Sequence, residues 1–165
     1  MRWYALALAA LSLVAATPPA AGRAEPLAII VSSAWEGADV IELRDLRALY
    51  LGRRSSLFGE RVRRIDLPPG SAARAGFSET VLGRPEAELE RYWIEQALSG
   101  GALPPRQVLG AQEMVAAVRA RPGTIGYVPA RELAYAGDGV RAVAILVDGV
   151  VTKTGDPGYP AQTHE

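Results

Sequence analysis

The sequence predicts an α/β domain in which a small, mixed and mostly parallel sheet is flanked by helices. Two observations carry this prediction. Short apolar runs typical of buried strands alternate with segments whose apolar residues recur at helical spacing. Glycines and prolines separate the two kinds of segment. Strands that alternate with helices favour parallel pairing, because the helices then serve as the crossover connections.

The first half of the expected domain contains two strands and a helix. The unbroken apolar run at 27–33 predicts a buried strand. Residues 42–51 carry leucines at helical spacing, and Gly52 follows them where a helix is expected to end. Residues 56–60 are expected to form a loop, and 61–67 a second short strand.

Two helices are expected next. The first runs from Ser71 to about Gly83, and the second begins at Pro85, a position where proline is well tolerated. The apolar stripe of the second helix predicts that its aromatic residues lie in the core. The members of that stripe are Leu89, Tyr92, Trp93, Gln96 and Ala97. A linker is expected at 102–108.

The last third of the domain should add a helix and two or three strands. Residues 110–123 form an amphipathic pattern that places Met114, Val115 and Val118 inside. Residues 124–130 predict a strand. Residues 140–154 predict another strand, a turn at Asp148-Gly149 and a return strand.

Residues 1–24 have the pattern of a cleaved secretory signal peptide. Arg2 precedes an apolar run that two prolines interrupt, and Gly22 and Ala24 match the small residues before a cleavage site. The run is short for a membrane span, so an uncleaved anchor is the less favoured alternative. We therefore expect one domain at 25–165, located in the periplasm, without stable membrane insertion after cleavage.

Composition excludes several functions. Removal of Arg2 and Arg23 leaves sixteen basic and eighteen acidic residues, a net charge of −2, which argues against general nucleic-acid binding. The chain has no cysteine, so thiol catalysis, thiolate metal sites and disulfides are excluded. Its one histidine, His164, lies one residue from the end, where a catalytic base is not expected. No cofactor is expected.

The segment "DLPPGSAARAGF", residues 66–77, contains the candidate ligand site. Small residues lead into a helix start at Gly70, Ser71, Ala72 and Ala73. The first amides of a helix have no partner inside it, carry partial positive charge and can hold an anion. Arg74, in the first turn, is a cation where the helix alone favours an acid. The structural alternative is that Ser71 only caps the helix.

Two further features have both a functional and a structural interpretation. Tyr127, beside Gly126 in the strand at 124–130, is a minor candidate for the ligand site, or a half-buried core residue with a solvated hydroxyl. Seven arginines lie between residues 44 and 64 against only two acids. They would steer an anionic ligand or partner, or would form an ordinary solvated face.

Four segments, in the same order and spacing, resemble phosphate ABC-transporter substrate-binding proteins. They are "ELRDLRALYLGRRSSLFG", "DLPPGSAARAGF", "RPGTIGYVPA" and the closing "VAILVDG…GDPGYP". The resemblance extends over about 27–160 and is to a short branch that corresponds mainly to one lobe.

The resemblance implies one lobe of the type II periplasmic binding-protein fold and no catalysis. It places the anion cradle on Gly70–Ala73, with Ser71 matching the serine of the family's serine-glycine-threonine signature. Ala72 and Ala73 stand where that signature has glycine and threonine, and Leu67 stands where the family has an arginine. Contacts from the other lobe have no counterpart.

Three functions follow as hypotheses. The first is a periplasmic solute-binding module that takes a small oxyanion, with phosphate as the candidate, in phosphate transport or sensing. The second is an accessory module that kept the fold, lost the ligand and binds a transporter or sensor protein of the envelope. An enzyme is the third and is not expected, because carboxylates such as Asp39, Asp45 and Asp66 are not paired in the sequence.

Overall fold

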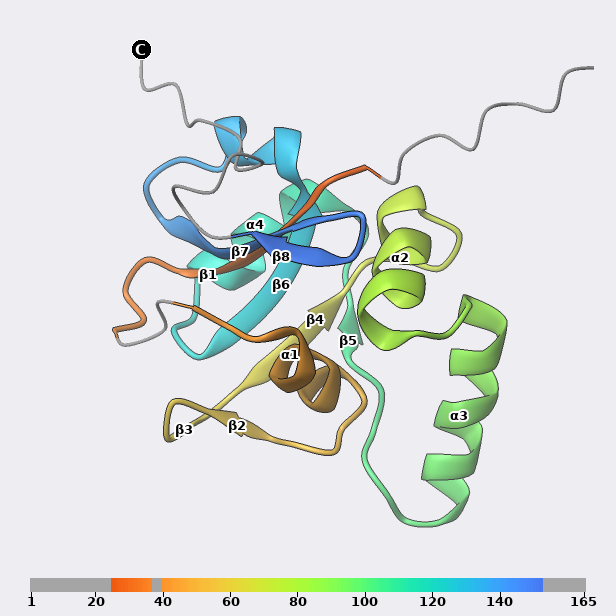
Figure 1. Ribbon diagram of the computed structural model, residues 1–165. Coiled ribbons are helices and arrows are strands. Elements are labelled where there is room, and N and C mark those ends of the chain that lie inside the picture. The colour runs from red at the N-terminus through yellow and green to blue at the C-terminus, as the bar shows by residue number, and fades with distance from the viewer. Residues whose placement is uncertain (1–24, 37–39, 153–165) are drawn as a thin grey trace, which may run out of the picture.

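The structure, a computed structural model, describes residues 25–36 and 40–152. Its centre is a six-stranded sheet of order β5-β4-β6-β1-β7-β8, drawn in Figure 1. The six strands are β1 (Leu27–Ser32), β4 (Arg63–Asp66), β5 (Arg106–Gln107), β6 (Thr124–Pro129), β7 (Val140–Val147) and β8 (Val150–Thr152). A separate hairpin pairs β2 (Ser56–Leu57) with β3 (Glu60–Arg61).

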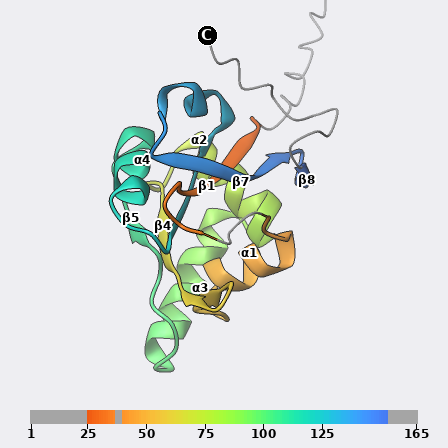
Figure 2. The same ribbon diagram turned by 90° about the vertical axis from the view of Figure 1, so that its left-hand side faces the viewer.

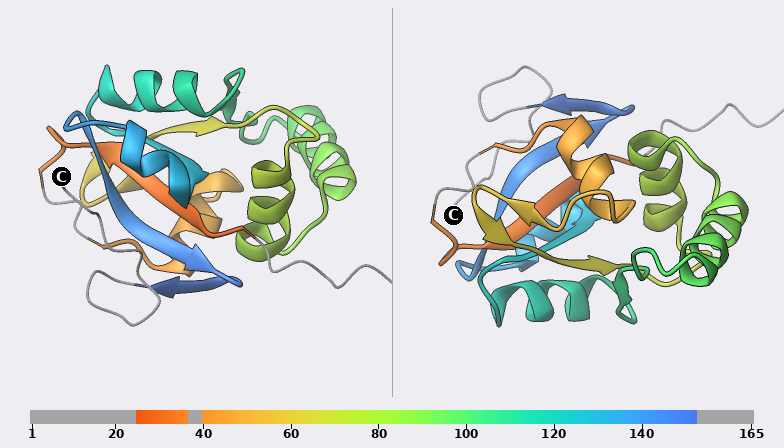
Figure 3. Two further views of the ribbon diagram at one scale, coloured as in Figure 1. Left: turned by 90° about the horizontal axis from the view of Figure 1, so that it is seen from above. Right: turned by 90° about the horizontal axis from the view of Figure 1, so that it is seen from below.

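Helices cover both faces of this sheet. They are α1 (Leu43–Tyr50), α2 (Ala72–Phe77) with the π-helical turn η1 (Ser78–Leu82), α3 (Glu86–Leu98), α4 (Ala111–Arg119) and the 3₁₀-helix η2 (Ala130–Tyr135). In Figure 3, α4 lies on one side of the sheet and α1 on the other. The α/β class and the flanking helices predicted from the sequence are therefore confirmed.

The balance of strand directions needs a correction. Two pairings are parallel, β4 with β5 and β4 with β6, whereas β1 is antiparallel to both β6 and β7, and β7 is antiparallel to β8. The connections of both parallel pairs contain helices, but so do the connections from β1 to its antiparallel partners β6 and β7. The antiparallel pair β7–β8 is joined by the expected turn at Asp148 and Gly149, which have φ angles of 49° and 78°.

Two neighbouring residues of β6 show which helices pack on each face of the sheet. A Cβ at Gly126 would collide with Met114 and Val118 of α4, so this glycine lets the helix approach the strand closely. The next residue, Tyr127, points to the opposite face and contacts Tyr50 of α1 and Phe77 of α2. All six residues of β1 are buried between these layers.

Helix α3 lies at the periphery, which corrects the expected core stripe. Leu89 is its only buried residue; Tyr92 and Trp93 are half-buried, and Ala97 is exposed. In Figures 1 and 2, α3 extends beyond the sheet. The stripe has helical spacing, but the helix meets the rest of the fold mainly through its first turn and its tyrosine, whose hydroxyl bonds to the Leu51 carbonyl.

Three other expectations change in detail. The segment at 56–60 is a β-hairpin, whose turn places Phe58 and Gly59 at positive φ. The linker at 102–108 contains β5, because it runs beside β4 and pairs with it. The helix from Ser71 to Gly83 is present, but its second half is π-helical. None of these short elements has enough periodic sequence to be recognised from pattern alone.

The expected signal peptide at 1–24 and the closing segment after 152 lie outside the described residues. Within 25–36 and 40–152, no helix combines the length and hydropathy needed to cross a membrane.

Candidate functional site

The predicted anion cradle lies at the carboxyl end of β4, where the chain turns into α2. Gly70 has a φ of +79°, a conformation that favours glycine. Ser71 is the N-cap of α2, and its hydroxyl oxygen accepts a hydrogen bond of 3.3 Å from the amide of Arg74. The structural role considered for Ser71 is thus the one that its side chain performs here.

A carboxylate of the chain itself occupies the beginning of this turn. The amide of Gly70 donates a hydrogen bond of 3.0 Å to Oε2 of Glu86. Glu86 is the first residue of α3, and it reaches the turn from sixteen residues further along the chain. The position at which a bound anion would meet the Gly70 amide therefore holds a negative group already.

Arg74 is directed into the protein. Only 8% of its surface is exposed. Its guanidinium donates a hydrogen bond of 3.0 Å to the Leu67 carbonyl and lies 3.3 Å from a carboxylate oxygen of Asp66. Its Nε is 3.7 Å from the second carboxylate oxygen of Glu86. The guanidinium is shared between two acids, so its charge is compensated within the fold.

Tyr127 belongs to the same cluster but is not open to solvent. Its exposed fraction is 0%, and its hydroxyl donates a hydrogen bond to the carboxylate of Asp66. Its ring stacks on Phe77 with a centroid distance of 3.9 Å and an interplanar angle of 2°. Asp66 thus joins Tyr127 to Arg74, and the solvated hydroxyl that the core interpretation assumed is absent at this tyrosine.

Burial controls the protonation of this cluster. It raises the pKa of Asp66 above the usual 3.8, and the hydrogen bond from Tyr127 and the charge of Arg74 offset part of that rise. Burial, and after it the charge of Asp66, raises the pKa of Tyr127 well above 10.0. Tyr127 is therefore a neutral donor at neutral pH. With both acids ionised, two negative charges face one positive charge.

A small part of the helix start stays open. Gly70 and Ala72 are exposed, Ser71 is half-buried and Ala73 is buried. The amides of Ala72 and Ala73 are the first two of α2, so neither has a carbonyl partner within the helix. The structure thus brings together all six predicted residues around one turn, but Arg74 and Tyr127 are buried, and the accessible part consists of Gly70, Ala72 and the half-buried Ser71.

Asp66 and Glu86 are the members of the cluster that the sequence did not single out. Asp66 was considered only as an unpaired carboxylate, whereas it and Glu86 converge on Arg74. A carboxylate at the end of a strand before a small-residue turn is a weak signal for Asp66. Glu86 has none, because only the return of α3 toward the turn brings it there.

The arginine-rich segment from 44 to 64 does not form a single free patch. Arg54 pairs with Asp45 at 2.7 Å and Arg44 with Glu42 at 2.8 Å, all at the surface. Arg64 donates hydrogen bonds to the Leu49 and Tyr50 carbonyls at the end of α1 and to the Leu103 carbonyl in the linker after α3, and burial lowers the pKa of its guanidinium below the usual value. Several of the arginines in this segment are therefore paired or hydrogen-bonded within the fold.

The described residues contain no group of three or more acids or histidines placed to hold a metal ion. The buried Asp66 and the half-buried Glu86 converge on the guanidinium of Arg74.

Comparison with solved structures connects this fold to phosphate-binding proteins. A protein from Clostridium perfringens, solved with bound phosphate and assigned to the phosphate ABC transporter substrate-binding proteins, superposes with a TM-score of 0.56 at 20% identity, over 78% of this chain and 48% of its own. An ABC-type phosphate transport receptor from Vibrio cholerae gives 0.56 at 15%, over 74% and 47%. PstS from Borrelia burgdorferi gives 0.56 at 13%, over 72% and 46%.

These similarities establish the fold. The resemblance drawn from four sequence segments is confirmed at that level, and the chain spans about half the length of the solved proteins that it matches. No protein-family model and no curated protein matches the sequence.

Proposed function

We propose that this chain is an accessory module of the cell envelope, with the fold of one phosphate-binding-protein lobe. It acts through contacts with a transporter or sensor protein, and it does not capture phosphate at the start of α2. The fold shared with phosphate transport proteins supports the setting. The signal-like pattern at 1–24 supports export to the periplasm, with 25–165 as the mature domain.

One observation carries the proposal: the carboxylate of Glu86 binds the Gly70 amide and faces Arg74. A phosphate ion at this turn would have to displace Glu86 and would meet a cluster whose net charge is −1 when both acids are ionised. Like charges at short range in a partly buried site repel by several kcal/mol at an effective dielectric constant near 20. Strong phosphate binding is therefore not expected here.

The module needs a surface for its partner, and α3 offers one. Ile94 and Leu98 lie one helical turn apart and are 55% and 84% exposed. Large apolar side chains exposed together on a peripheral helix are typical of contact surfaces. We assign the partner contact to this face, and the proposal includes no catalytic step.

Weak phosphate binding at the same turn is the second candidate. It is favoured by the amides of Ala72 and Ala73, which have no partner in the helix, together with Gly70 and the Ser71 hydroxyl. In this second candidate, Arg74 attracts the ion through its positive charge without a direct contact. Tyr127 contributes only through its hydrogen bond to Asp66, which in turn pairs with Arg74. Affinity would be modest, because a single lobe leaves the ion partly hydrated.

Calorimetry with phosphate, sulfate and a neutral sugar distinguishes the two candidates. For the full mature chain we expect no heat of binding at millimolar concentrations. Glu86→Gln should gain weak binding of both oxyanions, because it removes a negative charge and keeps an oxygen for the Gly70 amide. Glu88→Gln, an exposed acid in the same first turn of α3, is the matched control and should remain inactive.

Phosphate binding by the unmodified chain would contradict the accessory-module proposal. If Ser71→Asp, which keeps a capping oxygen and adds a negative charge, abolished that binding, the second candidate would replace it.

A further inference from the structure

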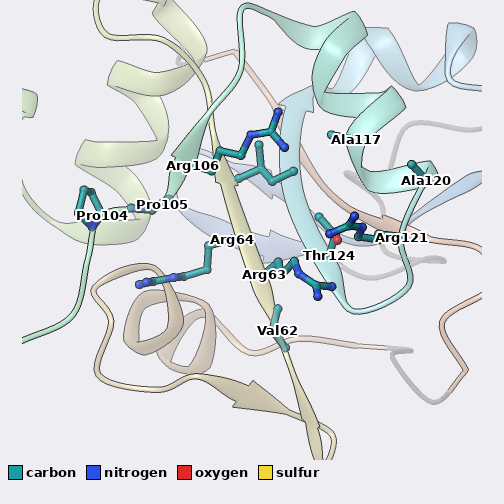
Figure 4. Close-up of a pocket in the computed structure, with 11 residues that line it drawn as sticks. Val62, Arg63, Arg64, Pro104, Pro105, Arg106, Ala117, Ala120, Arg121 and Thr124 are labelled. Carbon is teal, nitrogen blue, oxygen red and sulfur yellow. The ribbon is translucent and has the colours of Figure 1, made fainter.

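A strongly basic groove lies on the α4 side of the sheet, away from the cluster around Arg74. It has a volume of about 460 Å³. Its walls come from β4, the prolines before β5, the start of β6 and the carboxyl end of α4. The lining residues are Val62, Arg63, Arg64, Ile65, Pro104, Pro105, Arg106, Ala117, Ala120, Arg121 and Thr124. Figure 4 shows them.

The charge of this groove has one sign. Four of its lining residues are arginines and none is acidic. The guanidinium of Arg64 is turned away to backbone carbonyls, as Figure 4 also shows. Arg106 is 4.0 Å from Glu113 in an exposed pair, and Arg63 and Arg121 have no acidic partner among the residues that the structure describes. At least two guanidinium groups are therefore available to a ligand.

Thr124 supplies an independent observation at the same place. Only 2% of its surface is exposed, and its hydroxyl is buried without a hydrogen-bond partner among the described residues. Buried hydroxyl groups in folded proteins normally have a partner, because burial without one costs free energy. Thr124 lines the groove, so a ligand there would supply the missing partner.

The backbone brings this hydroxyl close to Arg63 and Arg121. Thr124 lies beside Arg63 in the parallel register of β4 and β6. The Gly123 carbonyl accepts a 2.8 Å hydrogen bond from the Arg63 amide, which anchors the short loop from Arg121 to Thr124 against β4. In Figure 4, Arg63, Arg121 and Thr124 lie at one end of the groove.

The other end of the groove combines apolar residues with the exposed Arg106, which is paired with Glu113. The apolar residues of this end include Ile65, Pro105 and Ala117. A volume of about 460 Å³ is within the range of small-molecule sites, about 300–1,000 Å³, and is larger than a bare oxyanion needs. Guanidinium groups bind phosphate and carboxylate oxygens in paired hydrogen bonds.

We propose that this groove binds a small organic anion, with its phosphate or carboxylate group at Arg63, Arg121 and the Thr124 hydroxyl, and its apolar body along Ile65, Pro105 and Ala117. The site is independent of the proposed function, since none of its residues belongs to the cluster around Arg74. Either inference can fail while the other stands.

Titration of the full mature chain by NMR tests the proposal with three probes. Phenyl phosphate carries both the anionic group and the apolar body, inorganic phosphate carries the first alone, and benzyl alcohol the second. We expect phenyl phosphate to bind more tightly than either of the others and to shift the amide signals of groove residues. Benzoate, tested in parallel, shows whether the preferred head group is phosphate or carboxylate.

Variants make the test specific. Arg63→Gln and Arg121→Gln should each weaken phenyl phosphate binding by about ten-fold to a hundred-fold, as the loss of a charge-assisted hydrogen bond does. Arg61→Gln is the matched control, because Arg61 is exposed two residues away and does not line the groove. Thr124→Val keeps the shape and removes the hydroxyl. It should weaken binding several-fold without lowering the stability of the free protein.

Several results would overturn the proposal. They are the absence of signal shifts in the groove at millimolar phenyl phosphate, equal binding of inorganic phosphate, or equal loss of affinity in Arg61→Gln. A free protein destabilised by Thr124→Val would show that the hydroxyl already has a partner, and would remove the observation that locates the ligand.

Discussion

The hydroxyl of Tyr127 donates a hydrogen bond to the carboxylate of Asp66, sixty-one residues earlier in the chain, and both groups are buried. This contact joins β6 to the carboxyl end of β4, directly beneath the turn at which a ligand was expected. The only polar atom of the Tyr127 side chain is therefore engaged inside the protein.

Tyr127→Phe should destabilise the protein by about 1–3 kcal/mol at pH 7, because it leaves a buried carboxylate without its donor. Tyr50→Phe is the matched control: its hydroxyl bonds to the neutral Ile65 carbonyl, and its loss should cost about 1 kcal/mol. Urea unfolding measures both. The Tyr127 hydrogen bond lowers the pKa of Asp66, so the penalty of Tyr127→Phe should shrink as the pH falls toward 4. A penalty independent of pH would show that Asp66 is not the group affected.

Asp66 itself should give the stability of the protein a measurable pH dependence. Its pKa in the folded state is raised above 3.8, so the folded state binds its proton more tightly than the unfolded state. The free energy of unfolding therefore falls as the pH rises from about 3.8 through the folded pKa. Asp66→Asn removes this contribution. Urea unfolding measures the free energy of unfolding of wild type and of Asp66→Asn, and the wild-type value minus the variant value should decrease over that window. An increase would mean that the charge of Arg74 affects the pKa of Asp66 more than burial does.

Arg74→Met should be among the most damaging single substitutions. It leaves Asp66 and Glu86 buried or half-buried without their cation, which typically costs about 3–5 kcal/mol. The loss should be smaller in the double variant with Asp66→Asn, which removes one of the uncompensated charges. Arg54→Met breaks the exposed pair with Asp45 and should cost less than about 1 kcal/mol. Equal losses for the two arginines would contradict the description of a buried network.

Ser71 should act as a helix cap whatever the ligand. Ser71→Ala is expected to lower the free energy of unfolding by about 1 kcal/mol, because the Arg74 amide loses its acceptor. Ser71→Asp keeps an acceptor oxygen and should be close to wild type by the same measure. If Ser71→Ala unfolds at the same urea concentration as wild type, the hydrogen bond at 3.3 Å contributes nothing.

The partner surface assigned to α3 is tested by the pair Ile94→Ser and Leu98→Ser. Both residues are more than half exposed, so the free energy of unfolding of the double variant should stay within about 0.5 kcal/mol of the wild-type value. It should lose an envelope partner that cross-links to wild type through this helix. Glu90→Ser, an exposed residue on α3, should retain that partner. Retention by the double variant would remove α3 from the proposal.

The sequence was sufficient for the parts of the fold with long, regular patterns. The apolar run of β1, the leucine spacing of α1 and the Asp148-Gly149 turn are all where they were predicted. The antiparallel pairing of β1 was missed, because direction depends on partners far away in the chain. The exposed stripe of α3 was missed because helical spacing does not show how far a helix lies from the sheet.

The candidate site was predicted less completely than the fold. The cap at Ser71 and the proximity of Arg74 to the turn follow from local sequence. The direction in which Arg74 points does not, because it depends on two acids that arrive from β4 and α3. Thr124 could not be recognised either, since an unsatisfied hydroxyl is visible only when its neighbours are known.

The position of β1 in the sheet has a consequence for how the chain matures. β1 is the first strand of the described residues, yet Leu27 lies opposite Pro129 on one side and Leu146 on the other. The central strand therefore has no partner until almost the whole domain has left the ribosome, and contacts that distant in sequence form slowly.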